Sequence, residues 1–321
     1  MRNIETGVCL GPQRKYLILS LSKDARTDRL AASSLKEEEG MSETVVAAND
    51  AAPPSEERQL GEAELWQILR SEAESAAAHE TMLRGFLDLA VLRHKSFGRA
   101  LVSLLAGKLA ERFMPAERLE DLARGAIAED VAIIDAARAD LVAIRTRDPA
   151  AENFLTPFLY YKGFHALEWH RVGHWLWQQG RRDLAHHLGS RVSEVFAVDI
   201  HPAVPVGRGV FIDHGTGVVV GETSVIGNDV SILQNVTLGG TGKERGDRHP
   251  KVRDGVLLAA GAKVLGNIEV GARAKVGAGS VVLKDVPPCA TVAGVPARIV
   301  GWCSDMVPAL AMDQSLPERR G

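Results

Sequence analysis

The chain has 321 residues, of which 45% are hydrophobic and 25% charged, and its formal net charge is −3. This composition is typical of a globular protein, and the lack of a basic excess argues against binding to nucleic acid. The longest apolar run near the N-terminus, residues 16–21, is too short to cross a bilayer and has no small-residue cleavage site, so we expect neither a membrane anchor nor a signal peptide.

Residues 1–60 are predicted to be a disordered extension. Residues 33–55 are rich in Ala, Ser, Glu and Pro and contain few large apolar side chains, so they cannot bury enough surface to fold. A second methionine, Met41, lies inside this stretch, and we hypothesise that it is the natural start of the protein.

From residue 61 to 196 the apolar pattern is helical, and we expect four to six helices there. Leu65, Ile68 and Leu69, for example, recur at spacings of three and four residues. The pair Asp148-Pro149 interrupts the pattern, and we interpret it as a helix start.

From residue 197 to 300 the helical period gives way to a period of six. A small apolar residue returns at every sixth position from Ile200 to Val218, from Val220 to Leu238 and from Val252 to Val282, and glycine often follows it. Six residues for each flat face and three faces for each coil are typical of a hexapeptide β-helix, whose stacked coils satisfy one another's backbone hydrogen bonds.

The predicted fold is therefore α + β: an N-terminal α-helical domain at 61–196, followed by a left-handed parallel β-helix of hexapeptide repeats at 197–300. The left hand is an exception to the usual handedness of parallel crossovers. A β-sandwich is disfavoured because no alternation of period two is sustained along these residues.

The six-residue phase breaks twice. It slips by two residues between Val218 and Val220, and fourteen residues separate Leu238 from Val252. The second break, residues 239–251, is charged and rich in glycine, so we expect it to leave the prism as an extruded loop. Residues 301–321 are expected to be a flexible C-terminal tail.

Three cysteines, Cys9, Cys289 and Cys303, are spread over the chain. Their odd number, wide spacing and lack of a CxxC pair argue against a disulfide framework and against a structural zinc site. We therefore expect a reducing compartment, the cytoplasm, and no bound metal.

Three histidines lie in or beside the predicted coils: His201, His214 and His249. Histidine is the side chain best suited to proton transfer near neutral pH. Stacked coils bring residues about eighteen positions apart into register, so Asp199 is expected near His214. The alternative for each of these residues is an ordinary solvated position on a coil.

Eight short segments carry a more specific signal. They are 148–154 (DPAAENF), 160–166 (YYKGFHA), 198–202 (VDIHP), 213–217 (DHGTG), 221–223 (GET), 237–243 (TLGGTGK), 246–250 (GDRHP) and 293–298 (AGVPAR). Together they resemble serine O-acetyltransferase, the enzyme of cysteine biosynthesis that forms O-acetyl-L-serine from L-serine and acetyl-CoA. The resemblance covers roughly residues 62–301.

The resemblance implies catalytic roles for particular residues. His214 matches the general base that takes the proton of the serine hydroxyl, and Asp199 matches the carboxylate that orients this imidazole, as in a Ser-His-Asp triad whose hydroxyl comes from the substrate. Asp148 and Asp213 match the residues that receive the serine ammonium. The attack on the thioester is then direct, in a ternary complex.

The other matched residues would hold the rest of the two substrates. Arg248 and His249 match the residues that bind the serine carboxylate and the reacting region, so His249 also counts as catalytic. No permanently bound cofactor is expected, because acetyl-CoA acts as a co-substrate. Its candidate contacts are Gly240, Thr241, Ala260, Lys275 and Ala278.

The resemblance also implies partners. It predicts a homotrimer or a dimer of trimers, that is, a homohexamer, and it predicts L-cysteine as a feedback inhibitor that competes with serine. Many family members bind O-acetylserine sulfhydrylase through a C-terminal tail that commonly ends in isoleucine. This chain ends in Gly321, which argues against that partner.

Three alternatives remain open. Another hexapeptide O-acetyltransferase, acting on a sugar or an antibiotic, would keep the coil and one histidine but would have no need for Asp148. A β-helix carbonic anhydrase would need His201, His214 and His249 to meet on a zinc ion. A non-catalytic assembly subunit would tolerate the loss of His214.

Overall fold

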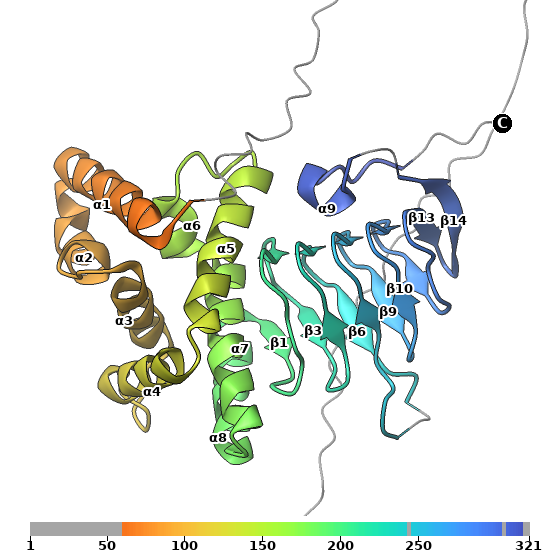
Figure 1. Cartoon of the computed structure of the whole chain (residues 1–321), viewed down its shortest axis with the longest axis horizontal. Coiled ribbons are helices and arrows are strands. Elements are labelled where there is room, and N and C mark those ends of the chain that lie inside the picture. Colours follow the sequence, from red (N-terminus) through yellow and green to blue (C-terminus); the bar gives the residue numbers. More distant parts are fainter. Residues whose placement is uncertain (1–59, 243–244, 304–305, 317–321) are drawn as a thin grey trace, which may run out of the picture. The chain divides into compact units, whose positions relative to one another are not determined.

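The computed structural model describes residues 60–242, 245–303 and 306–316 (Figure 1). The predictions of a disordered extension before residue 60 and of a start at Met41 lie outside the described residues, as does Gly321. No helix in the described part of the chain is long and apolar enough to cross a membrane.

Helices fill the first half of the described chain. They are α1 (Glu62–His79), α2 (Arg84–Leu87), α3 (Phe97–Leu109), α4 (Ala116–Glu129), α5 (Ala132–Arg147), α6 (Leu155–Tyr160), α7 (Lys162–Gln178) and α8 (Arg182–Phe196), with a 3-10 turn η2 (Thr81–Leu83) and a π turn η3 (Asp88–Leu92). The prediction of four to six helices between residues 61 and 196 was therefore too low, because α2 and α6 are too short to show a period.

The interpretation of Asp148-Pro149 as a helix start was wrong. The backbone N–H of Asp148 donates to the carbonyl of Ile144 and closes the last turn of α5, and ψ of Asp148 is 110°. A residue that precedes proline is sterically biased away from the helical conformation. The pair therefore ends α5, and α6 begins only at Leu155.

The second half of the chain winds into a three-sided prism, confirming the predicted β-helix. Sheet A contains β1 (Val198–Ile200), β3 (Val218–Val220), β6 (Thr237–Gly239), β9 (Lys263–Leu265) and β12 (Val281–Val282). Sheet B contains β4 (Val225–Ile226), β7 (Lys251–Val252) and β10 (Glu269–Val270). Sheet C contains β2 (Phe211–Ile212), β5 (Ser231–Ile232), β8 (Leu257–Leu258), β11 (Lys275–Val276), β13 (Ala290–Gly294) and β14 (Ala297–Trp302).

Every pairing is parallel except that of β13 with β14. The apolar residues at every sixth position point into the prism and are buried, except Val206, which is only partly buried. Because each coil pairs with the next through its backbone, the prism is a rigid support for side chains placed on its edges.

The strand register locates both breaks in the repeat. A regular coil has 18 residues, as between Leu257 and Lys275. The first coil has 20, from Val198 to Val218, and the coil from Thr237 to Lys263 has 26. The extra residues of the long coil form the predicted extruded loop between β6 and β7.

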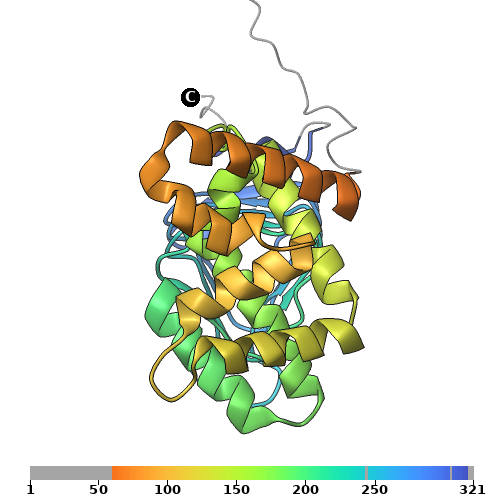
Figure 2. The same cartoon turned by 90° about the vertical axis from the view of Figure 1, so that its left-hand side faces the viewer.

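A buried cluster of charges joins the helices to the first coil. Arg171 of α7 forms an ion pair with Asp140 of α5 and donates hydrogen bonds to the carbonyls of Val206 and Gly207, at 3.2 and 2.8 Å. Asp140 in turn accepts the backbone N–H of Val210 at 2.7 Å. Figure 2 shows the helices in front of the coils that they cover.

The prediction of a flexible tail after residue 300 was wrong for its described part. Strand β14 continues to Trp302, and the chain then returns along sheet C to helix α9 (Pro308–Ala311), where Ala309 is fully buried. The hydroxyl of Ser231 donates to the carbonyl of Ala309 at 2.8 Å. Sheet C thus gains a cover that the sequence pattern did not reveal.

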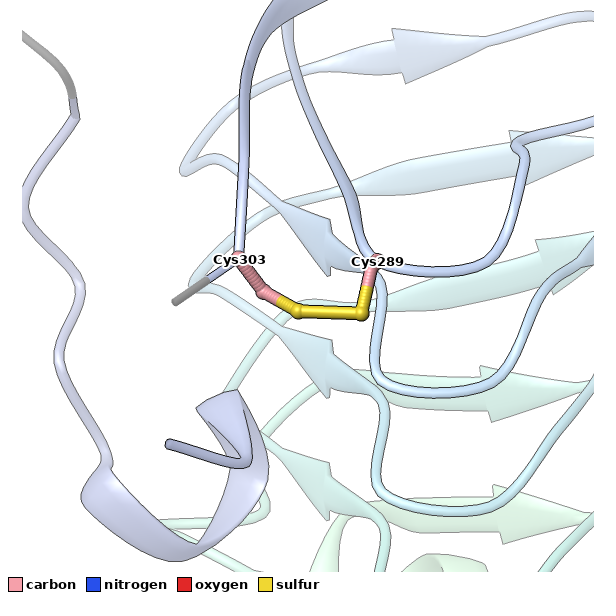
Figure 3. Close-up of a disulfide and its surroundings, with 2 residues drawn as sticks. All are labelled: Cys289 and Cys303. Atoms are coloured by element: carbon pink, nitrogen blue, oxygen red, sulfur yellow. A yellow bond between two sulfur atoms is a disulfide. The ribbon is translucent and has the colours of Figure 1, made fainter. Parts of the chain in front are cut away.

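The expectation of no disulfide was also wrong. Cys289 and Cys303 form a disulfide with their Cα atoms 4.9 Å apart (Figure 3). The antiparallel hairpin of β13 and β14 places Ala290 opposite Trp302, so the residues just outside this pair face each other. Antiparallel pairing, which spacing along the chain does not report, brings these two cysteines together.

Candidate active site

The predicted site residues lie along the two edges of sheet A. The first edge is where sheet C leads into sheet A, and it precedes β3; the second edge is where sheet A leads into sheet B, and it follows β3. His214 is on the first edge, whereas Arg248 and His249 are on the second. The width of sheet A separates these two groups within one chain.

The two-residue slip in the repeat forms the first edge at His214. Ile212 and Val220 pair with Ile232 and Leu238, so eight positions here replace six in the next coil. His214 takes up the extra length in a left-handed conformation, with φ 55°. Its side chain is 72% exposed, and its Nε2 atom lies 3.8 Å from Oδ1 of Asp213.

Two carboxylates and a tyrosine surround this edge. Asp148 accepts the hydroxyl of Tyr161 at 2.9 Å on one oxygen and the N–H of Ala150 at 2.9 Å on the other. Burial raises the pKa of Asp213, and the nearby Asp148 carboxylate raises it further while His214 opposes the shift. Burial and Asp148 together raise the pKa of Tyr161 to about 12. A bound cation would relieve the repulsion between the two acids.

The start of α7 packs against the prism and so places Asp148 and Tyr161 beside it. Any Cβ at Gly163 would collide with the carbonyl oxygen of Ile212, so only glycine permits this approach. The ammonium of Lys162 donates to the hydroxyl of Thr216, on the same edge as His214. The helical segments therefore place Asp148 and Tyr161 beside the first coil.

The second edge is built around Thr223. Its hydroxyl oxygen accepts the backbone N–H groups of Arg248 and His249, both at 3.0 Å. The Arg248 guanidinium donates to Glu222 at 2.8 Å. His249 is 7% exposed although it belongs to the extruded loop. The loop thus folds back and presents these two side chains at a fixed place.

Two glycines leave room for the His249 ring. A Cβ at Gly221 would collide with the imidazole, and a Cβ at Gly240 would lie 3.6 Å from its Nε2 atom. Burial lowers the pKa of His249, and the positive charge of Arg248 lowers it further. The ring is therefore favoured in its neutral form.

Asp199 is not in contact with His214. It lies in β1 in register with Val219, exposed on the outer face of sheet A. Within the described residues His214 has Asp213, and not Asp199, within ion-pair distance. Asp199 lies close enough to His201 to affect it. Burial lowers the pKa of His201, and the negative charge of Asp199 opposes this shift. The orienting role of Asp199 remains a prediction.

The candidate contacts of CoA divide between the same edges. Ala260 and Ala278 stack on the first edge, where the N–H of Gly279 donates to the carbonyl of Ala260 at 2.8 Å. Gly240 and Thr241 lie on the second edge. Lys275 lies on sheet C, where its ammonium is 2.7 Å from the carbonyl oxygen of Ser315 in the C-terminal segment.

The sequence analysis missed three residues of the two edges: Tyr161, Glu222 and Thr223. They lie in the segments 160–166 and 221–223, which carried the resemblance. Each contacts a predicted site residue: Tyr161 contacts Asp148, Glu222 contacts Arg248 and Thr223 contacts His249. Their proximity to those residues in the motifs was the available signal.

Comparison with known proteins adds to this geometry. Residues 65–169 match the family model described as serine acetyltransferase, N-terminal. The chain is 56% identical over 250 residues to the serine acetyltransferase of Escherichia coli strain K12, a match that covers 78% of this chain and 92% of that protein.

Solved structures of similar proteins carry ligands. A serine acetyltransferase in complex with cysteine is 54% identical, with a TM-score of 0.78, and the match covers 80% of this chain and all of that one. Another, in complex with CoA, is 55% identical, with a TM-score of 0.72, over 75% of this chain and all of that one. The Neisseria gonorrhoeae protein in complex with serine is 51% identical, with a TM-score of 0.71, over 73% of this chain and 96% of that one.

Proposed function

We propose where the reaction of this chain takes place, given that it belongs to the serine acetyltransferase family and transfers the acetyl group of acetyl-CoA to L-serine. The site lies between the first edge of one copy and the second edge of its neighbour. The separation of His214 from Arg248 and His249 by sheet A carries this proposal. A zwitterionic substrate needs anionic and cationic groups close together. In one chain the anionic groups lie on the first edge and the cationic groups on the second, so one chain alone does not bring them together.

On the first edge, Asp148 and Asp213 receive the serine ammonium. Two partly buried carboxylates that repel each other form a favourable site for one positive charge. The helical part, residues 61–196, supplies Asp148, while the coils, residues 197–300, supply the remaining residues. We propose these two segments as the functional division of the chain.

His214 acts as the general base at the same edge. It accepts the proton of the serine hydroxyl as the hydroxyl oxygen attacks the carbonyl carbon of the thioester, and the carbon–sulfur bond then breaks as CoA leaves with a proton from the imidazolium. Such a base contributes about 10²- to 10⁴-fold to the rate. Asp199 is proposed to orient the imidazole once substrates and a neighbouring copy are in place.

On the second edge, Arg248 and His249 hold the serine carboxylate and the reacting region. The ion pair of Arg248 with Glu222 at 2.8 Å fixes the guanidinium. The pantetheine arm of acetyl-CoA passes along Ala260 and Ala278 of one copy and along Gly240 and Thr241 of the other. We propose that Lys275 also contacts CoA, after its ammonium has released its hydrogen bonds to the C-terminal segment.

Assembly follows from the divided site. We propose a homotrimer of prisms, because a ring of three copies lets each first edge meet a second edge. A second contact would join two trimers through the helices, where Met82 is 90%, Leu89 54% and Phe86 36% exposed. Apolar side chains clustered in this way mark an interaction surface. L-cysteine, which has the ammonium and carboxylate of serine, is proposed to compete for the same site.

Mixing two inactive variants tests the division of the site. His214→Ala removes the base from the first edge, and His249→Ala removes the donor from the second, so each variant alone should lose nearly all serine-dependent release of CoA. Co-expressed copies should regain activity, because random mixing leaves roughly one site in four with both native edges. Two inactive variants that stay inactive when mixed would contradict a site shared between copies.

The acceptor is tested in the same assay. Wild-type protein should release CoA thiol with L-serine and not with sugars, and added L-cysteine should raise the apparent KM for serine. Acetyl transfer to a sugar that exceeds transfer to L-serine would favour the alternative acyltransferase. Activity retained by His214→Ala would favour the non-catalytic alternative.

We also propose that the enzyme works in the cytoplasm. Acetyl-CoA is strongly charged and does not diffuse through membranes, so the enzyme must share a compartment with the CoA pool. When cells are fractionated, the serine-dependent release of CoA should therefore be recovered in the cytoplasmic fraction. Activity recovered only outside that fraction would contradict the proposed compartment.

A further inference from the structure

The hydroxyl of Thr223 has a defined set of hydrogen bonds. Its oxygen accepts the N–H of Arg248 and the N–H of His249, each at 3.0 Å, and it lies 2.9 Å from Nδ1 of His249. The backbone N–H of Thr223 also donates to the same Nδ1 atom, at 3.1 Å. These four contacts join the turn between β3 and β4 to the end of the extruded loop.

The tautomer of His249 follows from proton counting. A hydroxyl group has one proton and two acceptor positions. Both acceptor positions are occupied by the N–H groups of Arg248 and His249, so the hydroxyl proton is left for Nδ1 or for the carboxylate of Asp247, which also hydrogen-bonds to Thr223. In either case Nδ1 accepts the backbone N–H of Thr223, so it carries no proton, and in the neutral ring the proton is on Nε2.

The Nε2 atom lies between two glycines of this edge. A Cβ on Gly240 would approach it to 3.6 Å, and a Cβ on Gly221 would collide with it. No described residue accepts a hydrogen bond from Nε2, and Nε2 is not among the fully buried polar atoms without a partner, so it keeps some accessible surface although the residue is only 7% exposed. His249 therefore presents a hydrogen-bond donor, and not a base, to whatever binds there.

We propose that Thr223 is a positioning residue of the transferase: its hydroxyl holds His249 as the Nε2-protonated donor to a substrate oxygen and aligns Arg248 beside it. The inference rests on the proposed function, in which these two side chains hold the serine carboxylate and the reacting region. Thr223 itself touches neither substrate. It acts by fixing which nitrogen of His249 carries the proton and where the loop ends.

This assignment gives the two histidines different chemical roles. His214, largely exposed and bonded to no side chain that fixes its tautomer among the described residues, is free to accept a proton. His249, held by Thr223, cannot accept one at Nδ1 without losing the hydrogen bond from the Thr223 N–H. One histidine is thus the base and the other a fixed donor.

The test compares two substitutions at one position. Thr223→Val keeps the shape and removes the hydroxyl, whereas Thr223→Ser keeps the hydroxyl. We expect Thr223→Val to lower kcat/KM for L-serine about 100-fold, as for a misplaced binding group, and Thr223→Ser to restore most of that loss. Equal losses in both variants would overturn the inference, since a retained hydroxyl would then not restore activity.

A spectroscopic measurement separates positioning from mere structural support. In protein with ¹⁵N-labelled histidine, the signals of His249, assigned through His249→Gln, should show an unprotonated Nδ1 and a protonated Nε2. Thr223→Val removes the oxygen that accepts the N–H groups of Arg248 and His249, so the loop end should move away from the Thr223 N–H, the two tautomers should mix and the pKa of His249 should rise. A wild-type ring protonated on Nδ1, or an unchanged ring in Thr223→Val, would overturn the inference.

Failures of the two proposals are distinguishable. If His249→Ala keeps wild-type activity, the proposed role of His249 fails whatever Thr223 does. If His249→Ala is inactive while Thr223→Val matches the wild type, only the role of Thr223 fails. Should Thr223→Val not fold, the tautomer in the wild type and in Thr223→Ser still decides the assignment.

Discussion

At the scale of single residues, His214 combines strain with exposure. A left-handed conformation costs a residue other than glycine about 1–2 kcal/mol, and His214 adopts it at φ 55° between Ile212 of sheet C and Val218 of sheet A. The neighbouring Gly215 and Gly217 also have positive φ. The result is a bulge that carries an imidazole away from the prism, where a substrate and a second copy can reach it.

The two carboxylates beside His214 should determine the affinity for the serine ammonium. Asp148→Asn removes one charge, and since a hydrogen bond to a charged group contributes about 1.5–3 kcal/mol, KM for L-serine should rise roughly 10- to 150-fold. Initial rates at varied serine, with KM for acetyl-CoA as the internal control, check this. A KM for serine that stays at the wild-type value would exclude Asp148 from the ammonium site.

At the scale of elements, the contact between α7 and β2 links the helices to catalysis. Overpacking costs typically about 1–3 kcal/mol, so Gly163→Ala should lower the free energy of unfolding by about that amount and reduce kcat/KM for serine, because it separates Asp148 from His214. The matched control is Gly125→Ala in α4, where an added Cβ meets no atom within 4 Å. That variant should gain about 0.5–1 kcal/mol and keep full activity. Denaturant titration and initial rates measure both effects.

The buried charges beneath this contact predict how stability depends on pH. Burial and the neighbouring Asp140 raise the pKa of Glu168, and burial also raises the pKa of Asp140 against the attraction of Arg171. Folding thus shifts both acids towards protonation, and most strongly Glu168, whereas Asp140 keeps its ion pair with Arg171. Their stabilising contribution is complete below the unfolded pKa, near 4.5 for Glu168, and is lost as the pH rises through the folded value.

Substitution at Glu168 tests whether its contribution to stability falls as the pH rises. Glu168→Gln removes the ionisation, so the variant should be more stable than the wild type at pH 8, by on the order of 1 kcal/mol, and the difference should shrink towards pH 4. Urea unfolding at several pH values measures the trend. A variant that loses stability mainly at pH 8 would show that the ionised carboxylate supports the fold.

The sequence predicted some elements well and others poorly for physical reasons. The six-residue period alone defined the coils, because every sixth residue must fill the interior of the prism. It did not reveal the C-terminal cover or the disulfide, since both depend on a hairpin that returns against the direction of the coils. At Asp148 the sequence pattern also assigned the helix to the wrong side, because the residue before a proline ends α5.

The predicted site residues share this limit. The motifs selected His214, Asp213, Arg248 and His249, yet only the register of β3 shows that they lie on opposite edges of sheet A. Tyr161, which contacts Asp148, and Thr223, which contacts Arg248 and His249, were passed over because a hydroxyl in a motif has many ordinary structural uses. Hydrogen-bond geometry, which spacing does not encode, identifies them.

At the scale of the whole molecule, two kinds of contact between copies are expected to have different consequences. Met82→Glu with Leu89→Glu places charges on the exposed apolar surface of the helices, so the mass measured by light scattering should fall from six chains to three. Activity per chain should persist, because the proposed sites lie between coils. Phe113→Glu, a charge at another exposed aromatic residue between α3 and α4, should leave the mass unchanged.

Either of two outcomes would reject this view of the assembly. If the doubly substituted protein keeps the mass of the wild type, the surface around Met82 is not the contact between trimers. If it loses activity in proportion to its loss of mass, the catalytic sites depend on the helical contact and not on the edges of the prisms.

The return of the chain from β14 to α9 also has a consequence for biosynthesis. Helix α9 contacts α5 and β8, so some of the last described residues complete the cover of elements made much earlier (Figure 1). On the ribosome, Ser231 and Leu257, both fully buried in the finished molecule, must wait uncovered until the final segment leaves the exit tunnel. Nascent chains stalled before residue 306 should therefore expose this strip of sheet C to chaperones.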